Sequence, residues 1–343
     1  MTQRRNAGGK NVARVAAVVV AYNREALLRE TLDALAAQTV KPDVLIVVNN
    51  ASTDGSEAVA ERAVDAWGKT ARLISLKKNT GGAGGFAVGI AAALTHERVL
   101  KAKLDWVWVM DDDTVPSATA LEAALAAHRS YCDSGQDDLA VMGSRVVWID
   151  GSGHAMNTPK PKIGASRHER DRAVAAAAMP IRSISFVSAF LRAPRIREVG
   201  LPVADYFLWN DDFEFSARML RNARGLFVPQ SVVTHKTKHS GSSDQDPGER
   251  FYVEVRNKLW VFRHSHALKL WERIAYRAAS LRRWVRSYLR SSDRATLVAA
   301  ARRGLRDGYA APPRSTPLVL ASAGVPADVM EVIATLSEQE RAR

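Results

Sequence analysis

Cysteine and long apolar runs are almost missing from this chain. Cys132 is the single cysteine in 343 residues, which excludes an internal disulfide and a metal site built from several cysteines. No apolar run approaches the roughly 18 residues that a membrane-spanning helix needs. The first ten residues are polar and basic and do not resemble a signal peptide. We therefore expect a cytoplasmic protein, or one that is peripheral on the inner face of the plasma membrane.

Lys and Arg side chains outnumber acidic ones, and the formal net charge is therefore +13. Most of the excess lies in residues 258–306, which hold thirteen Lys and Arg side chains and two acidic ones, with Trp, Tyr and Leu interleaved. Arg and apolar residues at helical spacing are typical of a helix that lies on an anionic membrane surface. A solvated helix packed on the rest of the protein explains the pattern equally well. Nucleic-acid binding ranks last, since no motif for it accompanies the charge.

The first half of the chain alternates strand and helix patterns with short connections. This order predicts an α/β fold with a parallel sheet flanked by helices. Continuous apolar runs indicate strands that are buried on both faces. The expected strands are 15–21, 44–48, 72–76, 105–110 and 140–147, and the expected helices are 25–37, 56–67, an alanine-rich helix that follows a glycine cluster and ends at 94, and 117–130.

The second half is less regular. Residues 150–181 show no sustained period and are expected to form a long loop. Order resumes at 183–191, followed by a helix at 209–223 and two short strands, 226–228 and 232–235. A polar stretch at 238–247 then precedes another helical pattern and the basic region.

Three consecutive carboxylates, Asp111, Asp112 and Asp113, follow the apolar strand 105–110 directly. Ligands of open α/β folds bind at the carboxyl ends of the strands. Three acids there favour a divalent cation, and oxygen ligands select Mg²⁺ or Mn²⁺. The alternative is a helix start, because Asp is favoured at N-caps and in first turns, but a cap needs one acid and not three.

Two polar turns follow the second and third strands. Asn50 and Asp54 lie in the first and could grip a nucleoside, although ordinary turn and N-cap chemistry explains an isolated motif of this kind. The second turn departs from both the dinucleotide-binding and P-loop patterns. Its glycines would still let the backbone approach a diphosphate or sugar. Its residues of interest are Asn79, Gly81, Gly82, Gly84 and Gly85.

A second acidic cluster lies about a hundred residues after the first. Asp211, Asp212 and Glu214 follow Trp209, among aromatic neighbours that would raise a carboxylate pKa toward the range of a general base. First-turn helix acids are the alternative interpretation. Further on, a histidine after a short strand could complete the cation site. His235 is the first candidate, and spacing leaves His239 open.

The ordered set of motifs resembles the family-two inverting glycosyltransferases of GT-A fold, over residues 14–263. It comprises Val18-Val-Val-Ala-Tyr-Asn23, Val47-Val-Asn-Asn-Ala-Ser-Thr-Asp-Gly-Ser56, Asn79-Thr-Gly-Gly-Ala-Gly-Gly-Phe86, Trp108-Val-Met-Asp-Asp-Asp113 and Trp209-Asn-Asp-Asp-Phe-Glu-Phe215, followed by His235. The glycine segment, the Trp-Val-Trp strand and Asp246-Pro-Gly-Glu-Arg-Phe251 with Arg256-Asn257 are more narrowly similar to bacterial galactofuranosyltransferases, those of the actinobacterial cell wall above all.

The resemblance implies a role for each motif. Asp111 to Asp113 would be the Asp-x-Asp metal element, with Asp113 and His235 on Mn²⁺ or Mg²⁺ and Asp111 nearer the ribose or sugar. Asp211 would be the base that deprotonates the acceptor hydroxyl, with Asp212 as the fallback. Donor contacts are expected from Asn50, Asp54, Asn79, Asp112 and the four glycines, and acceptor contacts from Trp209 and Glu214.

The implied donor is UDP-galactofuranose, and the implied acceptor is a polyprenyl-diphosphate-linked glycan of the cell envelope. Asn49 and Asn50 replace an acidic residue that is common in the family, which leaves uridine and thymidine both open, and with them a rhamnosyltransferase that uses dTDP-rhamnose. Asn210, between Trp209 and the acids, leaves the choice of base open. A nucleotidyltransferase is a further alternative, and a basic binding module without catalysis is another.

The resemblance also divides the chain. We expect a basic tail at 1–13, a GT-A domain at 14–263 and a helical basic region at 264–343. Within the domain, 14–115 would bind the nucleotide and 116–263 the acceptor. Arg282, Arg283, Arg286 and Arg290, with Trp284 and Tyr288, would dock the protein on an anionic membrane.

Overall fold

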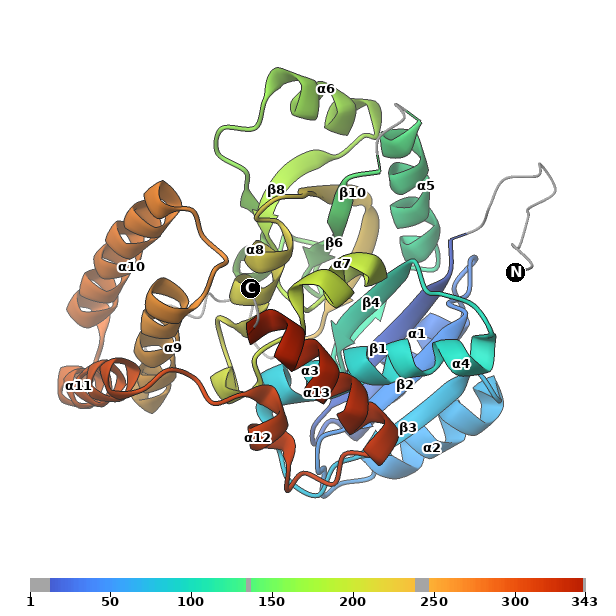
Figure 1. Cartoon of the computed structure of the whole chain (residues 1–343), viewed down its shortest axis with the longest axis horizontal. Helices are drawn as coiled ribbons and strands as arrows, with labels where there is room; N and C mark the ends of the chain where they lie inside the picture. The colour runs from blue at the N-terminus through green and yellow to red at the C-terminus, as the bar shows by residue number, and fades with distance from the viewer. Residues whose placement is uncertain (1–12, 134–136, 238–246, 342–343) are drawn as a thin grey trace.

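A mixed sheet forms the centre of the protein. The computed structural model describes residues 13–133, 137–237 and 247–341, and within these ranges ten strands join in one sheet (Figure 1). The strand order is β3-β2-β1-β4-β9-β6-β10-β8-β7, with β5 paired to β10. The strands are β1 (Val15–Ala21), β2 (Val44–Asn49), β3 (Ala71–Ser75), β4 (Trp106–Asp111), β5 (Thr114–Pro116), β6 (Leu139–Val147), β7 (Lys160–Pro161), β8 (Met179–Ser183), β9 (Ala189–Arg192) and β10 (Arg224–His235).

Strands β3, β2, β1 and β4 are parallel, and β6 and β10 are parallel to each other. Strand β9 runs antiparallel between β4 and β6. Strands β4 and β10 therefore point the same way, and their carboxyl ends meet at one edge of the sheet. This is the edge at which the acidic triplet was expected.

Helices cover both faces of the sheet, which confirms the expected α/β class. Alternate residues of β1 divide between two cores: Val19 faces one and Val18 the other. The first face is covered by α1 (Glu25–Ala36), α2 (Ser56–Trp67), α5 (Ala120–Cys132) and α6 (Arg167–Ala175). The second is covered by α3 (Gly81–Thr95), α7 (Ala193–Val199), α8 (Asp211–Met219) and α13 (Ala327–Arg341), with the short α4 (Glu97–Leu100) after α3.

The structure corrects four expected elements. Residues 150–181 are not one long loop, because they contain α6, whose N-cap Ser166 accepts a hydrogen bond from the Glu169 amide. The glycine segment is not a loop before α3 but its first turns. The two short strands are one strand, β10, with a register shift between Val228 and Val232. The helix expected at 209–223 is α8, which spans only Asp211–Met219.

The C-terminal part of the chain is helical and has two parts. Helices α9 (Phe251–His264), α10 (Leu270–Arg290) and α11 (Arg294–Ala310) lie together at one side of the protein (Figure 1). Helices α12 (Thr316–Leu320) and α13 return to the sheet, where Leu320 and Ile333 join the core beside α3. The domain boundary at 264 stays a prediction, and the expected basic tail lies almost wholly outside the described residues.

Among the helices of the described residues, none is both long and apolar enough to cross a membrane. Helix α10 has 21 residues, about the required length, but arginines interrupt it throughout.

Candidate active site

The acidic triplet lies where β4 ends and the chain turns into β5. Strand β5 pairs antiparallel with the end of β10, so that Thr114 lies opposite His235. The backbone amide of Lys236 also donates to the Asp113 carbonyl (2.9 Å). This pairing brings residues that are more than a hundred positions apart into one cluster.

Asp111, Asp113 and His235 form a set of side chains that fits a divalent cation. Each offers one ligand atom, and these atoms lie within 4.8 Å of one another. His235 Nδ1 lies 3.0 Å from Asn157 Oδ1, and Nε2 lies 3.1 Å from Asp113 Oδ1. With Nδ1–H donated to Asn157, Nε2 faces the carboxylates: when protonated it donates to Asp113, and when neutral it offers the lone pair that a metal ligand needs. Two carboxylates and one imidazole suit Mn²⁺ or Mg²⁺.

Burial and charge set the protonation of the triplet. Burial and the neighbouring Asp113 charge raise the pKa of Asp111 to about 6, and burial raises the pKa of Asp112 to about 7. Burial acts on Asp113 in the same direction, but its hydrogen bond to His235 and the charges of His235 and Arg24 outweigh it and lower the pKa of Asp113. The most deeply buried acid of the triplet is therefore held ionised.

Arg24 provides positive charge at this edge and was missed by sequence reasoning. Its guanidinium donates to Asp113 and, at 3.3 Å, to Asp112. Asp112 also accepts the Tyr22 amide (2.8 Å) and so ties the end of β1 to the end of β4. The expected donor contact of Asp112 is therefore accompanied by a structural role.

The second acidic cluster begins α8 after a strained turn. Phe207, Trp209 and Asn210 all have φ between 63° and 67°, a region that costs side chains other than glycine about 1 kcal/mol or more each. The turn places Asp211 and Asp212 at the start of the helix. Burial and the charge of Asp212 raise the pKa of Asp211 well above its usual range, and burial raises that of Asp212.

Helix α9 holds this turn in place. The Asn257 side-chain amide donates to the carbonyls of Tyr206 (2.9 Å), Leu208 (2.9 Å) and Trp209 (2.8 Å). Asn257 is fully buried, so the carbonyls of Leu208 and Trp209 depend on it for hydrogen bonds that water would otherwise supply, whereas the Tyr206 carbonyl also accepts from the Leu208 amide and from Arg256. One amide thus stabilises the strained backbone that positions the acids.

Glu254, also on α9, links the turn to α10. It accepts from Asn210 (2.8 Å), from Trp284 Nε1 (3.2 Å) and from Arg283. Lys258 lies one turn further on, over the Phe213 ring (4.1 Å). Burial lowers the pKa of Lys258 to about 8, and its charge acts to lower the pKa of Asp212.

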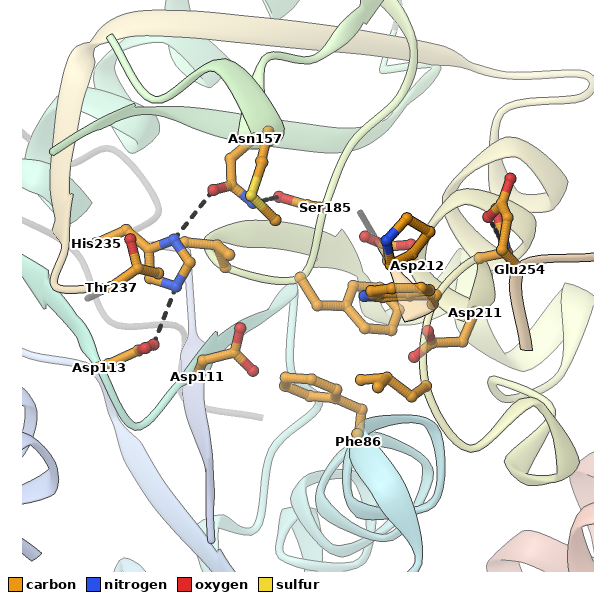
Figure 2. A pocket seen from close by; sticks show the side chains of 18 of the residues that line it. Phe86, Asp111, Asp113, Asn157, Ser185, Asp211, Asp212, His235, Thr237 and Glu254 are labelled. Atoms are coloured by element: carbon orange, nitrogen blue, oxygen red, sulfur yellow. Dashed lines mark hydrogen bonds and ion pairs between the residues drawn. The ribbon is translucent and has the colours of Figure 1, made fainter. Parts of the chain in front are cut away.

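Both acidic clusters line a single cavity of about 430 Å³. Figure 2 shows Asp111, Asp113 and His235 on one side of it, Asp211, Asp212 and Glu254 on the other, and Phe86 between them. Trp209 and Gly82, the expected acceptor and donor contacts, line the same cavity. Side chains that the sequence did not single out also contribute, namely Arg24, Asn157, Ser185, Phe186, Thr237 and Ser287. Arg283 and Trp284, which the sequence assigned to a membrane surface, line the cavity as well.

The two polar turns were expected to hold the nucleoside. Their side chains form hydrogen bonds mainly with other residues of the protein. Asn50 Oδ1 accepts from Thr80, and its amide nitrogen donates to Asn79 (3.1 Å) and to the Gly81 carbonyl (3.0 Å). Asp54 accepts the amides of Glu25 and Ser56, both at 3.0 Å. The alternative interpretation, turn and cap chemistry, describes these contacts. Asn50, Asp54 and Asn79 lie outside the set of described residues that line the cavity.

The glycines of α3 allow close packing. A Cβ on Gly85 would lie 2.5 Å from Val20 Cγ1, and one on Gly84 would lie 2.5 Å from the Thr80 side chain. Gly81 has a φ of +71° and contacts the Phe207 backbone. Of the four glycines expected beside a donor sugar, only Gly82 lines the cavity, because Gly85 faces the sheet, Gly84 faces the Thr80 side chain and Gly81 faces the Phe207 backbone.

Glu214 points away from the cavity. It pairs with Arg218 on the same helix (2.9 Å) and accepts from Ser265 (2.6 Å). The structure therefore does not bring it to the acceptor contacts expected of it. His239, the alternative to His235, lies outside the described residues.

The protein combines a mixed sheet with two acidic clusters that face each other across one cavity, and comparison with known proteins shows to which class it belongs. Residues 16–184 match the family model described as Glycosyl transferase family 2, so the chain carries a domain of this family and is a glycosyltransferase. The fold is GT-A, since the S. aureus TarS fragment 1–349 solved with UDP superposes with a TM-score of 0.55 at 17% identity, over 96% of this chain and 91% of that one.

Two further comparisons agree with this family and fold. The galactofuranosyltransferase GlfT1 of Mycobacterium tuberculosis is 29% identical over 276 residues, which cover 75% of this chain and 84% of the relative. GalNAc-T7, solved with UDP, GalNAc and Mn²⁺, gives a TM-score of 0.56 at 14% identity over 91% of this chain and 59% of that one. The resemblance stated from the sequence is thereby confirmed at the level of family and fold.

Proposed function

We propose that the chain transfers galactofuranose from UDP-galactofuranose to a glycan acceptor linked to polyprenyl diphosphate, in cell-envelope polysaccharide synthesis on the inner face of the plasma membrane. The observation that carries this proposal is the pair of acidic clusters facing each other across one cavity. The name of GlfT1 supports the sugar, and the UDP bound by TarS supports the nucleotide.

The arrangement suits a single displacement with inversion. Asp211 or Asp212 removes the proton of the acceptor hydroxyl, the acceptor oxygen bonds to the anomeric carbon, and the bond from that carbon to the UDP oxygen breaks. A base on one side of the sugar and the leaving diphosphate on the other require no covalent sugar–enzyme intermediate. Asp111, Asp113 and His235 would hold Mn²⁺ or Mg²⁺, which supplies Lewis-acid stabilisation to the departing diphosphate.

Arg24 would add a second positive group on the leaving-group side. Its guanidinium lies against Asp112 and Asp113 in the same cavity, and Arg presents donors suited to phosphate oxygens. The rhamnosyltransferase alternative rested on Asn49 and Asn50. The Asn49 side-chain oxygen accepts from Ser52 in its own turn, and the Asn50 oxygen accepts from Thr80 in the turn after β3, so no observation favours that alternative.

A donor screen tests the proposal. Purified full-length protein is offered UDP-galactofuranose, UDP-glucose, UDP-GlcNAc and dTDP-rhamnose with Mn²⁺ or Mg²⁺, and the released nucleotide is measured. We expect UDP from UDP-galactofuranose at the highest rate, and a loss of about 100-fold or more in Asp113→Ala. Glu61→Ala, which removes an exposed acid on α2, is the matched control.

Three outcomes would overturn the assignment. Preferred turnover of dTDP-rhamnose would make the protein a rhamnosyltransferase. Release of pyrophosphate instead of UDP would indicate a nucleotidyltransferase. Equal rates in Asp113→Ala and Glu61→Ala would remove Asp113 from the site.

A further inference from the structure

Helix α10 buries polar residues and exposes apolar ones. Its buried positions are Glu272, Ser280 and Ser287. On the outside, Leu270 is 74% exposed, Ile274 61%, Leu281 61% and Leu289 62%, and Trp271, Val285 and Tyr288 are exposed as well. A helix that only covers a protein core shows the reverse arrangement.

The exposed apolar residues form one stripe. At about 100° per residue, the seven positions from Leu270 to Leu289 fall within an arc of about 100°, opposite the buried Ser280 and Ser287. Arginines flank the stripe on both edges. Arg273 and Arg277 follow one edge, and Arg282, Arg286 and Arg290 follow the other.

The inner side of α10 is fixed by polar contacts and reaches the cavity. Glu272, in its first turn, pairs with Arg182 of β8 (2.6 Å). Near its other end, Arg283 and Trp284 donate to Glu254, and with Ser287 they line the cavity that holds the acidic clusters. Arg283 and Trp284, expected at a membrane, therefore face inward.

We infer that the outer stripe of α10 lies on an anionic lipid bilayer while its inner side forms a wall of the cavity. Arginines on both edges of an apolar stripe match anionic headgroups over acyl chains. A second copy fits poorly, because Glu272 is the one acidic residue of α10 and is buried, so two stripes in contact would bring arginines together. Nucleic acid would account for the arginines but leave the Leu, Ile and Val side chains without a partner.

This placement deepens the proposed function and rests on it for the acceptor. A helix with its side chains is about 10 Å across, so cavity and bilayer would be separated by the width of one helix. A lipid-linked acceptor would then present its sugar to Asp211 or Asp212 while its polyprenyl chain stays in the membrane.

Vesicle binding tests the surface without relying on catalysis. Full-length protein is sedimented with vesicles of phosphatidylglycerol and phosphatidylcholine in equal parts, and with phosphatidylcholine alone. We expect binding to the anionic vesicles, and a loss of about tenfold in the triple variant L281S/V285S/L289S. The control is I163S/V174S/L318S, which removes three exposed apolar side chains of other segments and should bind like the unaltered protein.

A charge variant separates the electrostatic contribution of the arginines to vesicle binding from the contribution of the apolar stripe. R282E/R286E/R290E should lose anionic-vesicle binding, and the binding of the unaltered protein should weaken with added salt. Equal sedimentation of L281S/V285S/L289S and its control would overturn the inference. A dimer of the unaltered protein that the same triple variant dissociates would assign the stripe to a second copy.

Turnover distinguishes failure of this inference from failure of the proposed function. UDP release from UDP-galactofuranose in solution should be the same in L281S/V285S/L289S as in the unaltered protein. If vesicle binding depends on the stripe but UDP is never released, the surface stands and the proposed function fails. If UDP is released and the stripe variants bind vesicles normally, the function stands and this inference fails.

Discussion

At the scale of single residues, two adjacent carboxylates are candidates for the same proposed role, that of the base. Asp211 and Asp212 lie at the start of α8, and burial together with the charge of Asp212 holds the pKa of Asp211 well above its usual range. The positive charge of Lys258 acts to lower the pKa of Asp212. The two acids therefore differ in environment although they are neighbours in sequence, which is the situation in which acid and base roles separate.

The pH dependence of the variants identifies the base. A base acts deprotonated, so kcat rises as pH increases through its pKa. If Asp211 is the base, Asp212→Asn removes a charge that raises the pKa of Asp211, and the acidic limb of the kcat profile shifts to lower pH. Asp211→Asn should lose about 100-fold or more at every pH. The reverse pattern, with Asp212→Asn inactive and Asp211→Asn active, would assign the role to Asp212.

Asn257 offers a second test at this scale. Asn257→Ala removes the side-chain donor from the carbonyls of Leu208 and Trp209 and one of the donors to Tyr206, so we expect the free energy of unfolding to fall by about 2–4 kcal/mol. We also expect kcat to fall with little change in the KM for the donor, because in the proposed mechanism this turn positions the base. Asn222→Ala, at an exposed position, is the control in chemical denaturation and kinetics. Loss of stability with kcat intact would leave Asn257 a purely structural role.

The sequence predicted the position of a residue correctly where secondary structure alone determines that position. Asp111 ends a buried strand, so its position at the sheet edge followed from the pattern. The contacts of Asn50 and the inward direction of Arg283 depend on tertiary packing. Neither could be read from neighbouring residues in the chain.

At the scale of elements, α3 shows packing overriding propensity. Glycine costs about 1 kcal/mol in a helix interior, and four glycines in five residues indicated a loop. The helix nevertheless begins at Gly81, because residues without a Cβ let it approach β1 closely. Helix α6 was missed for a related reason, since tertiary contacts such as that of Arg172 with the Tyr131 carbonyl (3.2 Å) fix a segment with no clear apolar period.

Alanine at two glycines of α3 should have different effects on stability. Gly85→Ala places a Cβ 2.5 Å from Val20 Cγ1, and we expect a loss of about 1–3 kcal/mol in stability. For Gly82→Ala the nearest atom is 4.0 Å away, and a small gain or no change is expected. Thermal denaturation of both, with the double variant Gly85→Ala/Val20→Ala, measures the effect. A double variant no more stable than Gly85→Ala would contradict the assigned contact.

At the scale of the whole molecule, the C-terminal helices belong partly to the catalytic fold. The sequence placed 264–343 in one basic region because charge dominates its composition. The structure shows α12 and α13 joining the core of α3, while α10 and α11 lie to the side with α9 (Figure 1). Amino-acid composition could not reveal this division. The division depends on which apolar side chains of the C-terminal helices pack against the core.

Substitutions in α12 and α13 test this division. Ile333 is fully buried in the shared core, so Ile333→Ala should cost about 2–4 kcal/mol of stability. Leu318 on α12 is 63% exposed, and Leu318→Ala should change stability by no more than about 0.5 kcal/mol. Equal unfolding midpoints for the two variants would mean that α13 contributes little to the fold.

The return of α13 to α3 has a consequence during synthesis on the ribosome. Strands β1 and β2 and helix α3 emerge early, yet the apolar surface that Leu320, Val329 and Ile333 cover stays bare until residues 320–336 have left the exit tunnel. Domains generally fold as units while the chain is made. Here the core beside α3 in the first half of the chain is complete only after nearly the whole chain has been synthesised. Nascent chains stalled before α12 should therefore recruit chaperones that bind apolar surface, and chains released after α13 should not.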